Sequence, residues 1–216
     1  MTEPDVVVVA SGAGPSVTVP GASTVIAADG GLDRATALGL DVDVVIGDLD
    51  SVSAGALAAA EAAGARIVRH PEAKDATDLE LALDEAVRLG ARSVLLVASA
   101  EGRLDHLLGS LVLLGAEPYA AIELDAIVGE ALVHVVRGER ALRGSPGELL
   151  SLIAVGGPAT GVVTSGLDFP LASETLRPGS SRGLSNVFTA TEARVALDAG
   201  VLLAIRPDAA EAVRAR

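Results

Sequence analysis

Short runs of β-branched residues alternate with Ala- and Leu-rich segments over the first part of the chain. This alternation favours repeated βαβ units, in which parallel strands form a sheet and helices cover its faces. We therefore predict an α/β N-terminal domain over residues 1–125, built on a mainly parallel, Rossmann-like sheet. The strands expected in this domain cover residues 6–10, 24–28, 42–46, 66–68 and 93–98.

Two segments of this domain have the apolar spacing of amphipathic helices. Apolar side chains recur three and four positions apart at Leu79, Ala82, Leu83, Ala86 and Val87, and again at Leu104, Leu107, Leu108, Leu111 and Val112. Thr77, followed by Glu80 three positions later, matches a capping box, which predicts a helix that starts at Thr77 or Asp78. The apolar run 107–116 is about half a membrane span, and we predict that it is a buried helix.

The sequence pattern changes after residue 125. Gly and Pro now separate strand-length segments, which is typical of antiparallel all-β structures. We predict an all-β sandwich as the C-terminal domain, over residues 126–216. Its expected strands cover residues 131–136, 148–155, 159–165, 186–190 and 201–205.

Acidic residues outnumber basic residues by 29 to 16, which leaves a net charge of −13. The excess is confined to residues 1–125, which hold 20 acidic and 7 basic residues, whereas residues 126–216 hold 9 of each. A nucleic-acid binder needs a basic surface that displaces counterions from the phosphates, so the charge argues against nucleic acid as a partner. Half of the residues are apolar, which is enough for a core and excludes a disordered chain.

The sequence contains no cysteine. This excludes a disulfide framework and a thiolate metal site, and it fits a reducing compartment. The first five residues carry two acids, Glu3 and Asp5, and no basic residue, and the apolar run after them is much shorter than the core of a signal peptide. We therefore expect a cytoplasmic protein that has no membrane partner.

Acidic residues directly follow two of the predicted strands. Asp29 precedes two glycines, which allow a tight turn and a close approach to a ligand, although a helix cap would also explain Asp29. Asp48 and Asp50 follow the next strand. Two carboxylates this close repel unless a cation neutralises them, and carboxylate oxygens are typical ligands of Mg²⁺. Since ligands bind at the carboxyl ends of strands in open α/β sheets, we predict a functional site here.

Two further clusters precede the predicted helices. Lys74, the only lysine of the chain, lies close to Asp75 and Asp78, an arrangement suited to a metal-bound phosphate group. Asp78 alone could serve only the helix dipole. Arg103 near a helix N-terminus suits phosphate oxygens, whereas a surface ion pair with Asp105 is the alternative interpretation.

Other familiar ligand-binding motifs are missing from the sequence. A P-loop is excluded because Lys74 lacks the glycines of that motif. Gly12 and Gly14 follow the first strand, but Val17 stands where a dinucleotide fingerprint has its third glycine. The three histidines are too far apart in the sequence to indicate a zinc site.

Five segments occur in the order seen in thiamine pyrophosphokinases, and the chain resembles this family over nearly its whole length. They are Ala-Ala-Asp-Gly-Gly at 27–31, Gly-Asp-Leu-Asp-Ser at 47–51, Lys-Asp-Ala-Thr-Asp at 74–78, Gly-Arg-Leu-Asp-His at 102–106 and Gly-Leu-Ser-Asn at 183–186. Segments 151–153 and 166–171 also resemble the C-terminal domain of that family. The resemblance implies an α/β catalytic domain, a β-sandwich that contributes to thiamine binding and dimerisation, and a homodimer. The implied reaction is pyrophosphate transfer from Mg-ATP to thiamine, with release of AMP.

The resemblance further implies roles for individual residues. The implied catalytic residues are Asp48, Asp50, Asp78 and Asp105. The implied Mg²⁺ ligands are Asp48, Asp50 and Asp78. The implied ATP contacts are Asp29, Lys74, Thr77, Arg103 and Asp105. The implied thiamine contacts are Ser185 and Asn186, which would reach the pyrimidine across the dimer interface.

The sequence leaves three alternatives open. The same chemistry could act on another alcohol, such as a hydroxymethylpterin. The segment 48–52 also resembles the nucleophile loop of haloacid-dehalogenase-type phosphatases, although here it follows a later strand and the only lysine lies 24 residues after Asp50. The third alternative is a protein that binds thiamine without catalysis, because Glu101 stands where the family often has glycine and could impair the reaction.

Overall fold

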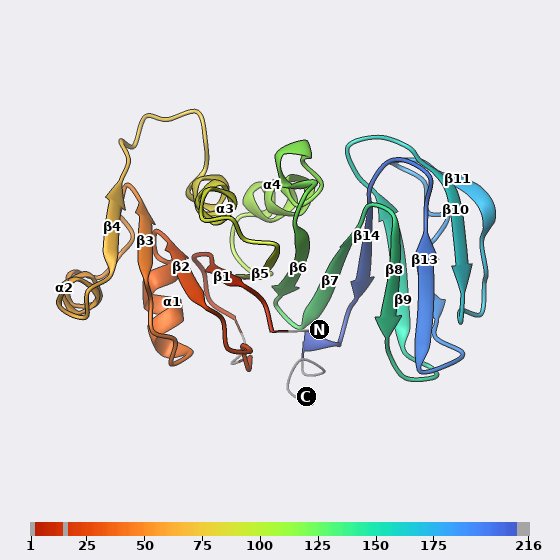
Figure 1. The fold of residues 1–216 in the computed structure, drawn as a ribbon, viewed down its shortest axis with the longest axis horizontal. Helices are drawn as coiled ribbons and strands as arrows, with labels where there is room; N and C mark the ends of the chain where they lie inside the picture. Colours follow the sequence, from red (N-terminus) through yellow and green to blue (C-terminus); the bar gives the residue numbers. More distant parts are fainter. Residues whose placement is uncertain (1–2, 15–16, 211–216) are drawn as a thin grey trace.

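A computed structural model describes residues 3–14 and 17–210 of the chain, so the start of the predicted N-terminal domain and the end of the predicted C-terminal domain lie outside the described residues. The first part of the described chain alternates strands and helices (Figure 1). Its strands are β1 (Val6–Val9), β2 (Thr24–Ala28), β3 (Val44–Gly47), β4 (Arg66–Arg69), β5 (Ser93–Ala98) and β6 (Glu123–Val128). Its α-helices are α1 (Gly31–Ala37), α2 (Ala54–Ala62), α3 (Asp78–Arg88) and α4 (Leu104–Leu113), and a 3₁₀-helix, η1, covers Glu117–Tyr119.

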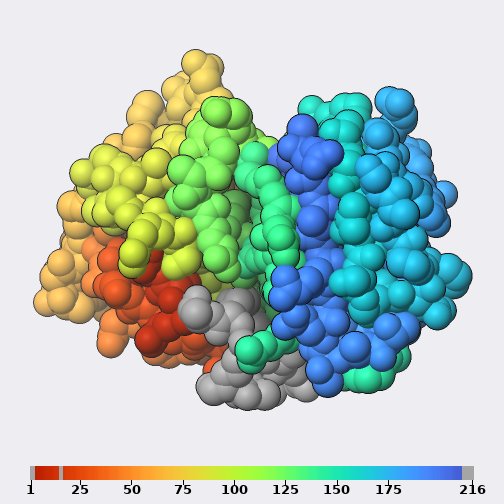
Figure 2. Space-filling view, turned by 45° about the vertical axis from the view of Figure 1, so that its right-hand side comes forward, coloured from red at the N-terminus to blue at the C-terminus, as the bar shows by residue number. Residues whose placement is uncertain are grey.

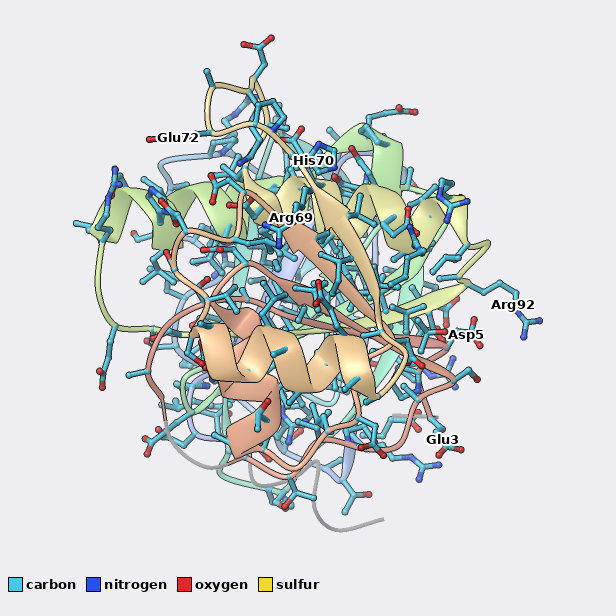
Figure 3. The ribbon with its side chains drawn as sticks, turned by 90° about the vertical axis from the view of Figure 1, so that its left-hand side faces the viewer. Glu3, Asp5, Arg69, His70, Glu72 and Arg92 are labelled. Atoms are coloured by element: carbon cyan, nitrogen blue, oxygen red, sulfur yellow. The ribbon has the colours of Figure 1, made fainter. Side chains whose placement is uncertain are left out.

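These six strands form a parallel sheet in the order β6-β5-β1-β2-β3-β4. After β1 the chain adds strands on one side as far as β4, and then returns to place β5 on the other side of β1. The carboxyl ends of β1 and β5 are therefore the point where the strand order reverses. At the opposite ends of these two strands, Asp5 accepts hydrogen bonds from the backbone N–H groups of Arg92 and Ser93 (Figure 3).

The helices cover both faces of the sheet because the buried strands have apolar side chains on both sides (Figure 1). On one face α3 packs Leu79 and Leu83 against Val8 and Ile26. On the other face Ala35 of α1 belongs to a separate apolar cluster with alternate residues of the same strands. The predicted start of α3 is confirmed, since the Thr77 side chain accepts a hydrogen bond from the Glu80 N–H.

The prediction of a buried helix at residues 107–116 was wrong. Within this segment α4 continues only to Leu113, and no residue of the helix is fully buried. Leu107 and Leu111 pack partly against the sheet, whereas Leu104, Leu108 and Val112 lie in the next row around the helix. These three side chains are 76%, 60% and 49% exposed, because the two rows span too wide an arc for one contact face.

The remaining eight strands of the described chain are antiparallel, and four of them extend the same sheet. They are β7 (Ala131–Val136), β8 (Glu139–Arg143), β9 (Leu149–Ala154), β10 (Ala159–Ser165), β11 (Ala172–Leu176), β12 (Asn186–Val187), β13 (Glu192–Ala196) and β14 (Leu202–Arg206). Strands β7, β14, β9 and β12 continue the sheet beyond β6, which gives ten strands in all among the described residues. Strands β11, β10, β13 and β8 form a second sheet.

The two antiparallel layers enclose one apolar core. Leu142 on β8 and Val195 on β13 face Leu152 on β9 and Leu202 on β14 in a single buried cluster. The space-filling view shows this part, teal to blue, packed beside the α/β part (Figure 2). The fold is therefore a large, mainly parallel sheet with helices, joined to an antiparallel two-layer region. The predicted domain boundary at residue 125 falls inside β6.

The sequence analysis did not predict four of the strands, namely β6, β8, β11 and β13. Charged residues interrupt three of them, and β11 is mostly small and polar. In β6 the charged residues are Glu123, which is exposed, and Asp125, which is 4% exposed because Arg140 and His134 bind its carboxylate. Within the described residues, none of the helices has the length and apolar character needed to span a membrane.

Candidate functional site

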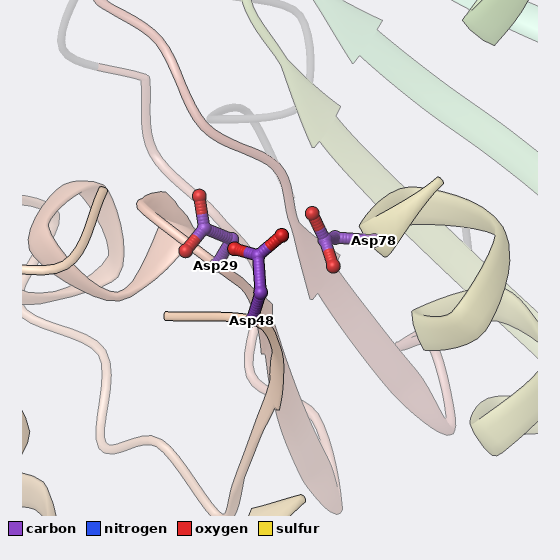
Figure 4. Close-up of side chains that lie close together, drawn as sticks. All are labelled: Asp29, Asp48 and Asp78. Atoms are coloured by element: carbon purple, nitrogen blue, oxygen red, sulfur yellow. The ribbon is translucent and has the colours of Figure 1, made fainter. Parts of the chain in front are cut away.

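Three predicted site residues converge at the carboxyl ends of the parallel strands. Asp29 follows β2, Asp48 follows β3 and Asp78 is the first residue of α3 (Figure 4). Each supplies a carboxylate oxygen, and the three oxygens lie within 4.8 Å of one another. Asp29, Asp48 and Asp78 therefore form one acidic cluster, although Asp29 and Asp78 are 49 positions apart in the sequence. We call this cluster the aspartate triad.

The backbone around the triad has positive φ angles and leaves no room for a side chain at Gly47. Asp29 has a φ of 46°, a conformation that costs free energy for a non-glycine residue, and its N–H donates to the Ile46 carbonyl. Gly47 has a φ of 145°. A β-carbon on Gly47 would lie 2.8 Å from Asp78 Oδ1 and 3.1 Å from the Asp29 β-carbon. Only glycine therefore allows the three carboxylates to come this close together.

Lys74 lies against the triad. Its Nζ donates to Asp48 Oδ2 at 3.0 Å and lies 3.0 Å from Asp78 Oδ1. Hydrogen bonding to Lys74 holds the pKa of the Asp48 carboxyl below its usual value. Burial lowers the pKa of Lys74, but the two carboxylates outweigh this effect and raise it. The ammonium group therefore offsets part of the repulsion among the three carboxylates.

The carboxylates also offer free oxygen atoms. Asp29 is 6% exposed, and its buried Oδ1 has no hydrogen-bond partner among the described residues. The Oδ1 of Asp78 is close enough to Lys74 for an ion pair, but lacks hydrogen-bond geometry. Buried carboxylate oxygens without donors are costly. Three converging carboxylates, two of which have an oxygen without a hydrogen-bond donor among the described residues, are a ligand set that suits Mg²⁺, so the residues fit a hard divalent cation.

Asp50 lies outside the triad in this structure. It is exposed, and its Oδ1 accepts a hydrogen bond from the Ser51 hydroxyl. Its N–H donates to Asp48 Oδ1 at 3.4 Å, a turn that requires a φ of 65° at Leu49. The assignment of Asp50 as a metal ligand stays a prediction.

Arg103 and Asp105 pair with each other at the surface. The guanidinium donates from Nε at 3.2 Å and from Nη2 at 2.6 Å to the two carboxylate oxygens. This pair lowers the pKa of Asp105 to about 2. Both side chains are about two-thirds exposed or more, at 71% and 65%. Their predicted contacts with ATP stay predictions, as does that of Thr77, whose hydroxyl oxygen caps α3.

The predicted thiamine residues lie at the start of β12, in the antiparallel region. Ser185 has a φ of 54°, and its N–H donates to the Ser151 hydroxyl. Asn186 is 2% exposed, and its amide binds the backbone of Phe169 twice: Oδ1 accepts from the Phe169 N–H at 3.0 Å, and Nδ2 donates to the Phe169 carbonyl at 2.8 Å. Asn186 therefore positions Phe169, and its direct contact with thiamine stays a prediction.

Phe169 and Gly47 are site candidates that the sequence analysis did not single out. Phe169 is 56% exposed, whereas Tyr119 and Phe188, the other two aromatic residues, are buried. Phe169 is therefore the one aromatic ring that a ligand could reach. The sequence signal for Gly47 was its place between a buried strand and paired acids. Four non-glycine residues in the described chain have positive φ, and three of them (Asp29, Leu49 and Ser185) lie in the predicted motifs.

Solved structures share this fold. The thiamin pyrophosphokinase family protein from Enterococcus faecalis is 21% identical, with a TM-score of 0.81 over 94% of this chain and 98% of that one. Thiamine pyrophosphokinase from Bacillus subtilis is 23% identical, with a TM-score of 0.79 and the same coverage. Thiamin pyrophosphokinase from Geobacillus thermodenitrificans is 25% identical, with a TM-score of 0.76 over 94% and 96% of the two chains. The search of curated proteins gave no significant match.

Two family models match consecutive parts of the chain. The model of the thiamin pyrophosphokinase catalytic domain matches residues 18–124, which include the aspartate triad and Lys74. The model of the thiamin pyrophosphokinase vitamin B1 binding domain matches residues 133–202, which include Phe169 and Asn186. Together the two models span most of the chain in the order in which the fold presents its two parts. The chain therefore belongs to the thiamin pyrophosphokinase family.

Proposed function

We propose that this chain, a thiamine diphosphokinase by its family, transfers the pyrophosphate group of Mg-ATP to the hydroxyl of thiamine and releases AMP. The observation that carries the proposal is the convergence of Asp29, Asp48 and Asp78 beside Lys74 at the carboxyl edge of the sheet. Transfer of this kind depends on positioning and on charge neutralisation more than on covalent work by the protein.

Mg²⁺ would be held by the aspartate triad, where the free Oδ1 of Asp29 supports the assignment. The ion would supply charge neutralisation at the phosphate oxygens during transfer. Asp50 would join as a ligand only after rotating away from Ser51, and Asp105 would leave its pair with Arg103. Without a bound cation, the carboxylates would repel the phosphates of ATP.

Lys74 would bind the phosphates of the nucleotide. Its ammonium lies between Asp48 and Asp78, so a divalent cation at the triad would compete with it for the same oxygens. A displaced Lys74 can turn to the phosphate oxygens without leaving the site. Arg103 and Thr77 would complete the ATP contacts at the starts of α4 and α3.

The thiamine would lie against Phe169 and Ser185. The exposed ring of Phe169 can stack on a planar heterocycle, and Asn186 holds the backbone of Phe169 on both sides. The negative charge of the α/β part also suits the cationic thiazolium ring, because opposite charges attract across the site.

A homodimer is the proposed assembly, as the family resemblance implies. The exposed row of Leu104, Leu108 and Val112 on α4 supports it, because a second copy could remove these side chains from water. Sedimentation of the wild type should give a dimer, and Leu108→Glu should shift it to monomer. A wild type that sediments as a monomer would refute the assembly.

The absence of cysteine supports the cytoplasm as the compartment.

The direct test is a product assay. Purified protein with ATP, Mg²⁺ and thiamine should yield AMP and thiamine diphosphate in equal amounts. The same assay with a hydroxymethylpterin should give no product, and chelation of Mg²⁺ should stop the reaction. Formation of ADP, or the absence of product with thiamine, would overturn the proposal. A trapped aspartyl phosphate would revive the phosphatase alternative.

A further inference from the structure

Arg34 on α1 carries a buried guanidinium for which the described residues provide no partner. The residue is 9% exposed, and Nη1 and Nη2 are both buried without a hydrogen-bond partner within residues 3–14 and 17–210. None of the carboxylates in those segments forms an ion pair with it, and burial lowers its pKa. A guanidinium nevertheless stays charged in proteins, so Arg34 is a buried cation that no carboxylate of the described residues compensates.

The guanidinium lies next to the loop that follows β1. A β-carbon on Gly14 would be 2.9 Å from Arg34 Nη2, so only glycine leaves room for the guanidinium at this position of the loop. The same loop begins beside the aspartate triad, because the Ser11 hydroxyl donates to the Ala28 carbonyl, one residue before Asp29. Arg34 and the triad therefore lie at opposite ends of residues 11–14.

This loop also lines the point where the strand order reverses. A β-carbon on Gly12 would lie 2.7 Å from the Ser99 β-carbon, and the Ser99 hydroxyl donates to the Ala13 carbonyl. Ser99 directly follows β5, so the loop contacts the ends of both β1 and β5. Open α/β sheets bind ligands at such a reversal point. The loop therefore connects the expected ligand crevice with the metal-binding acids.

A buried charge is tolerated only when it is paired or serves a ligand. Arg137 differs from Arg34 in that its Nη2 donates to the Ala116 carbonyl at 2.7 Å, although its Nε also lacks a partner among the described residues. Planar guanidinium groups bind phosphate oxygens through two parallel hydrogen bonds, which makes a phosphate the best-matched anion. The aspartate triad at the other end of the loop would repel a ligand that binds through a carboxylate. A metal ion held by the triad would instead attract a phosphate chain.

We propose that Arg34 binds the polyphosphate chain of the nucleotide donor at the loop formed by residues 11–14. This inference rests on the proposed use of Mg-ATP. Arg34 would hold the phosphates at the strand-reversal point while the aspartate triad holds their metal ion. The cost of burying the guanidinium in the free protein would be offset when the nucleotide binds.

The test is calorimetric titration of Mg-ATP, without thiamine, into the full chain and three variants. Arg34→Gln should raise the Kd by about tenfold or more, which is the usual effect of losing a charged hydrogen bond. Arg34→Lys should recover part of the loss. Arg137→Gln is the matched control and should bind Mg-ATP as the wild type does. Adenosine, which lacks phosphates, should bind the wild type and Arg34→Gln equally.

Thermal unfolding of the free proteins separates this role from a structural one. Arg34→Gln should keep or raise the Tm, because it removes an uncompensated buried charge, whereas Arg137→Gln should lower it. Gly14→Val is a second variant, which should displace the guanidinium and weaken Mg-ATP binding by a similar factor. Unchanged Mg-ATP affinity in Arg34→Gln, or an equal loss for adenosine, would overturn the inference alone. A wild type that does not bind Mg-ATP would overturn the proposed function as well.

Discussion

Lys74 Nζ lies 3.0 Å from Asp48 Oδ2, although the two residues are 26 positions apart in the sequence. The contact joins the only lysine of the chain to the carboxylate that follows β3. The pKa of Asp48 is lowered and that of Lys74 is raised, so both groups are charged over a wide pH range. This ion pair links the proposed metal-binding and phosphate-binding functions of the site.

Asp48→Asn should reduce pyrophosphate transfer by at least a hundredfold, since it removes a charge from the triad but keeps the side-chain size. The reaction should also require more Mg²⁺, which a titration of the rate against Mg²⁺ would measure. Asp41→Asn is the matched control, because Asp41 is exposed and lies outside the triad. Full activity in Asp48→Asn would refute a metal role for this residue.

Lys74→Met should have opposite effects on two ligands. Mg²⁺ alone should bind more tightly because its competitor at Asp48 and Asp78 is gone, whereas Mg-ATP should bind about tenfold more weakly through loss of a charged contact. The pKa of Asp48 should rise once its partner is removed, so activity should begin to fall at a higher pH on acidification. Titrations and a pH–rate profile measure these effects. Equal weakening of both ligands would argue for misfolding instead.

Gly47→Ala should lower activity strongly, because the new β-carbon would press on Asp78 and Asp29. The φ of 145° adds backbone strain, for an expected loss of about 1–3 kcal/mol in the free energy of unfolding. Denaturant unfolding and the transfer assay test both effects. Gly55→Ala in α2 is the control, since nothing lies within 4 Å of the added carbon, and it should be neutral or stabilising by up to about 1 kcal/mol.

Asn186→Ala should raise the KM for thiamine while leaving the KM for ATP unchanged, because it releases the backbone of Phe169. Phe169→Ala should have the same effect by removing the ring itself. If Asn186 acts through Phe169, the double variant should lose little more than either single variant. Additive losses would show that Asn186 contacts thiamine independently.

Asp125→Asn should destabilise the fold by about 3 kcal/mol, because it removes the carboxylate that binds buried His134 and partly buried Arg140. Burial alone would raise the pKa of Asp125, but these two partners hold it below its usual value. The carboxylate therefore stabilises the protein above the unfolded-state pKa of about 3.9, and this contribution is lost as the pH falls through the lower, folded-state value. Acid unfolding curves should show a smaller pH dependence in Asp125→Asn than in Asp41→Asn.

Local sequence patterns were sufficient to predict many of the helices and strands. The predicted strands 24–28, 93–98, 131–136 and 159–165 match β2, β5, β7 and β10 exactly in extent, since runs of β-branched residues between turns need little tertiary help. Charged strands such as β6 could not be recognised, because their charges are compensated by residues distant in sequence. The exposed apolar row of α4 also depended on how the helix rests on the sheet, which periodicity alone does not determine.

The sequence by itself determined the order of the motifs, the family resemblance, and the presence of acids after β2 and β3. Parallel strands bring their carboxyl ends to one edge, which makes such acids candidates for a common site. Tertiary structure alone decided which acids meet there: Asp29, Asp48 and Asp78 converge around Gly47, while Asp50 points elsewhere. The physical reason is that the backbone conformation of each loop, including the positive φ angles of Asp29, Gly47 and Leu49, decides whether neighbouring carboxylates share a site. Such conformations are set by packing across the sheet, which residue spacing does not encode.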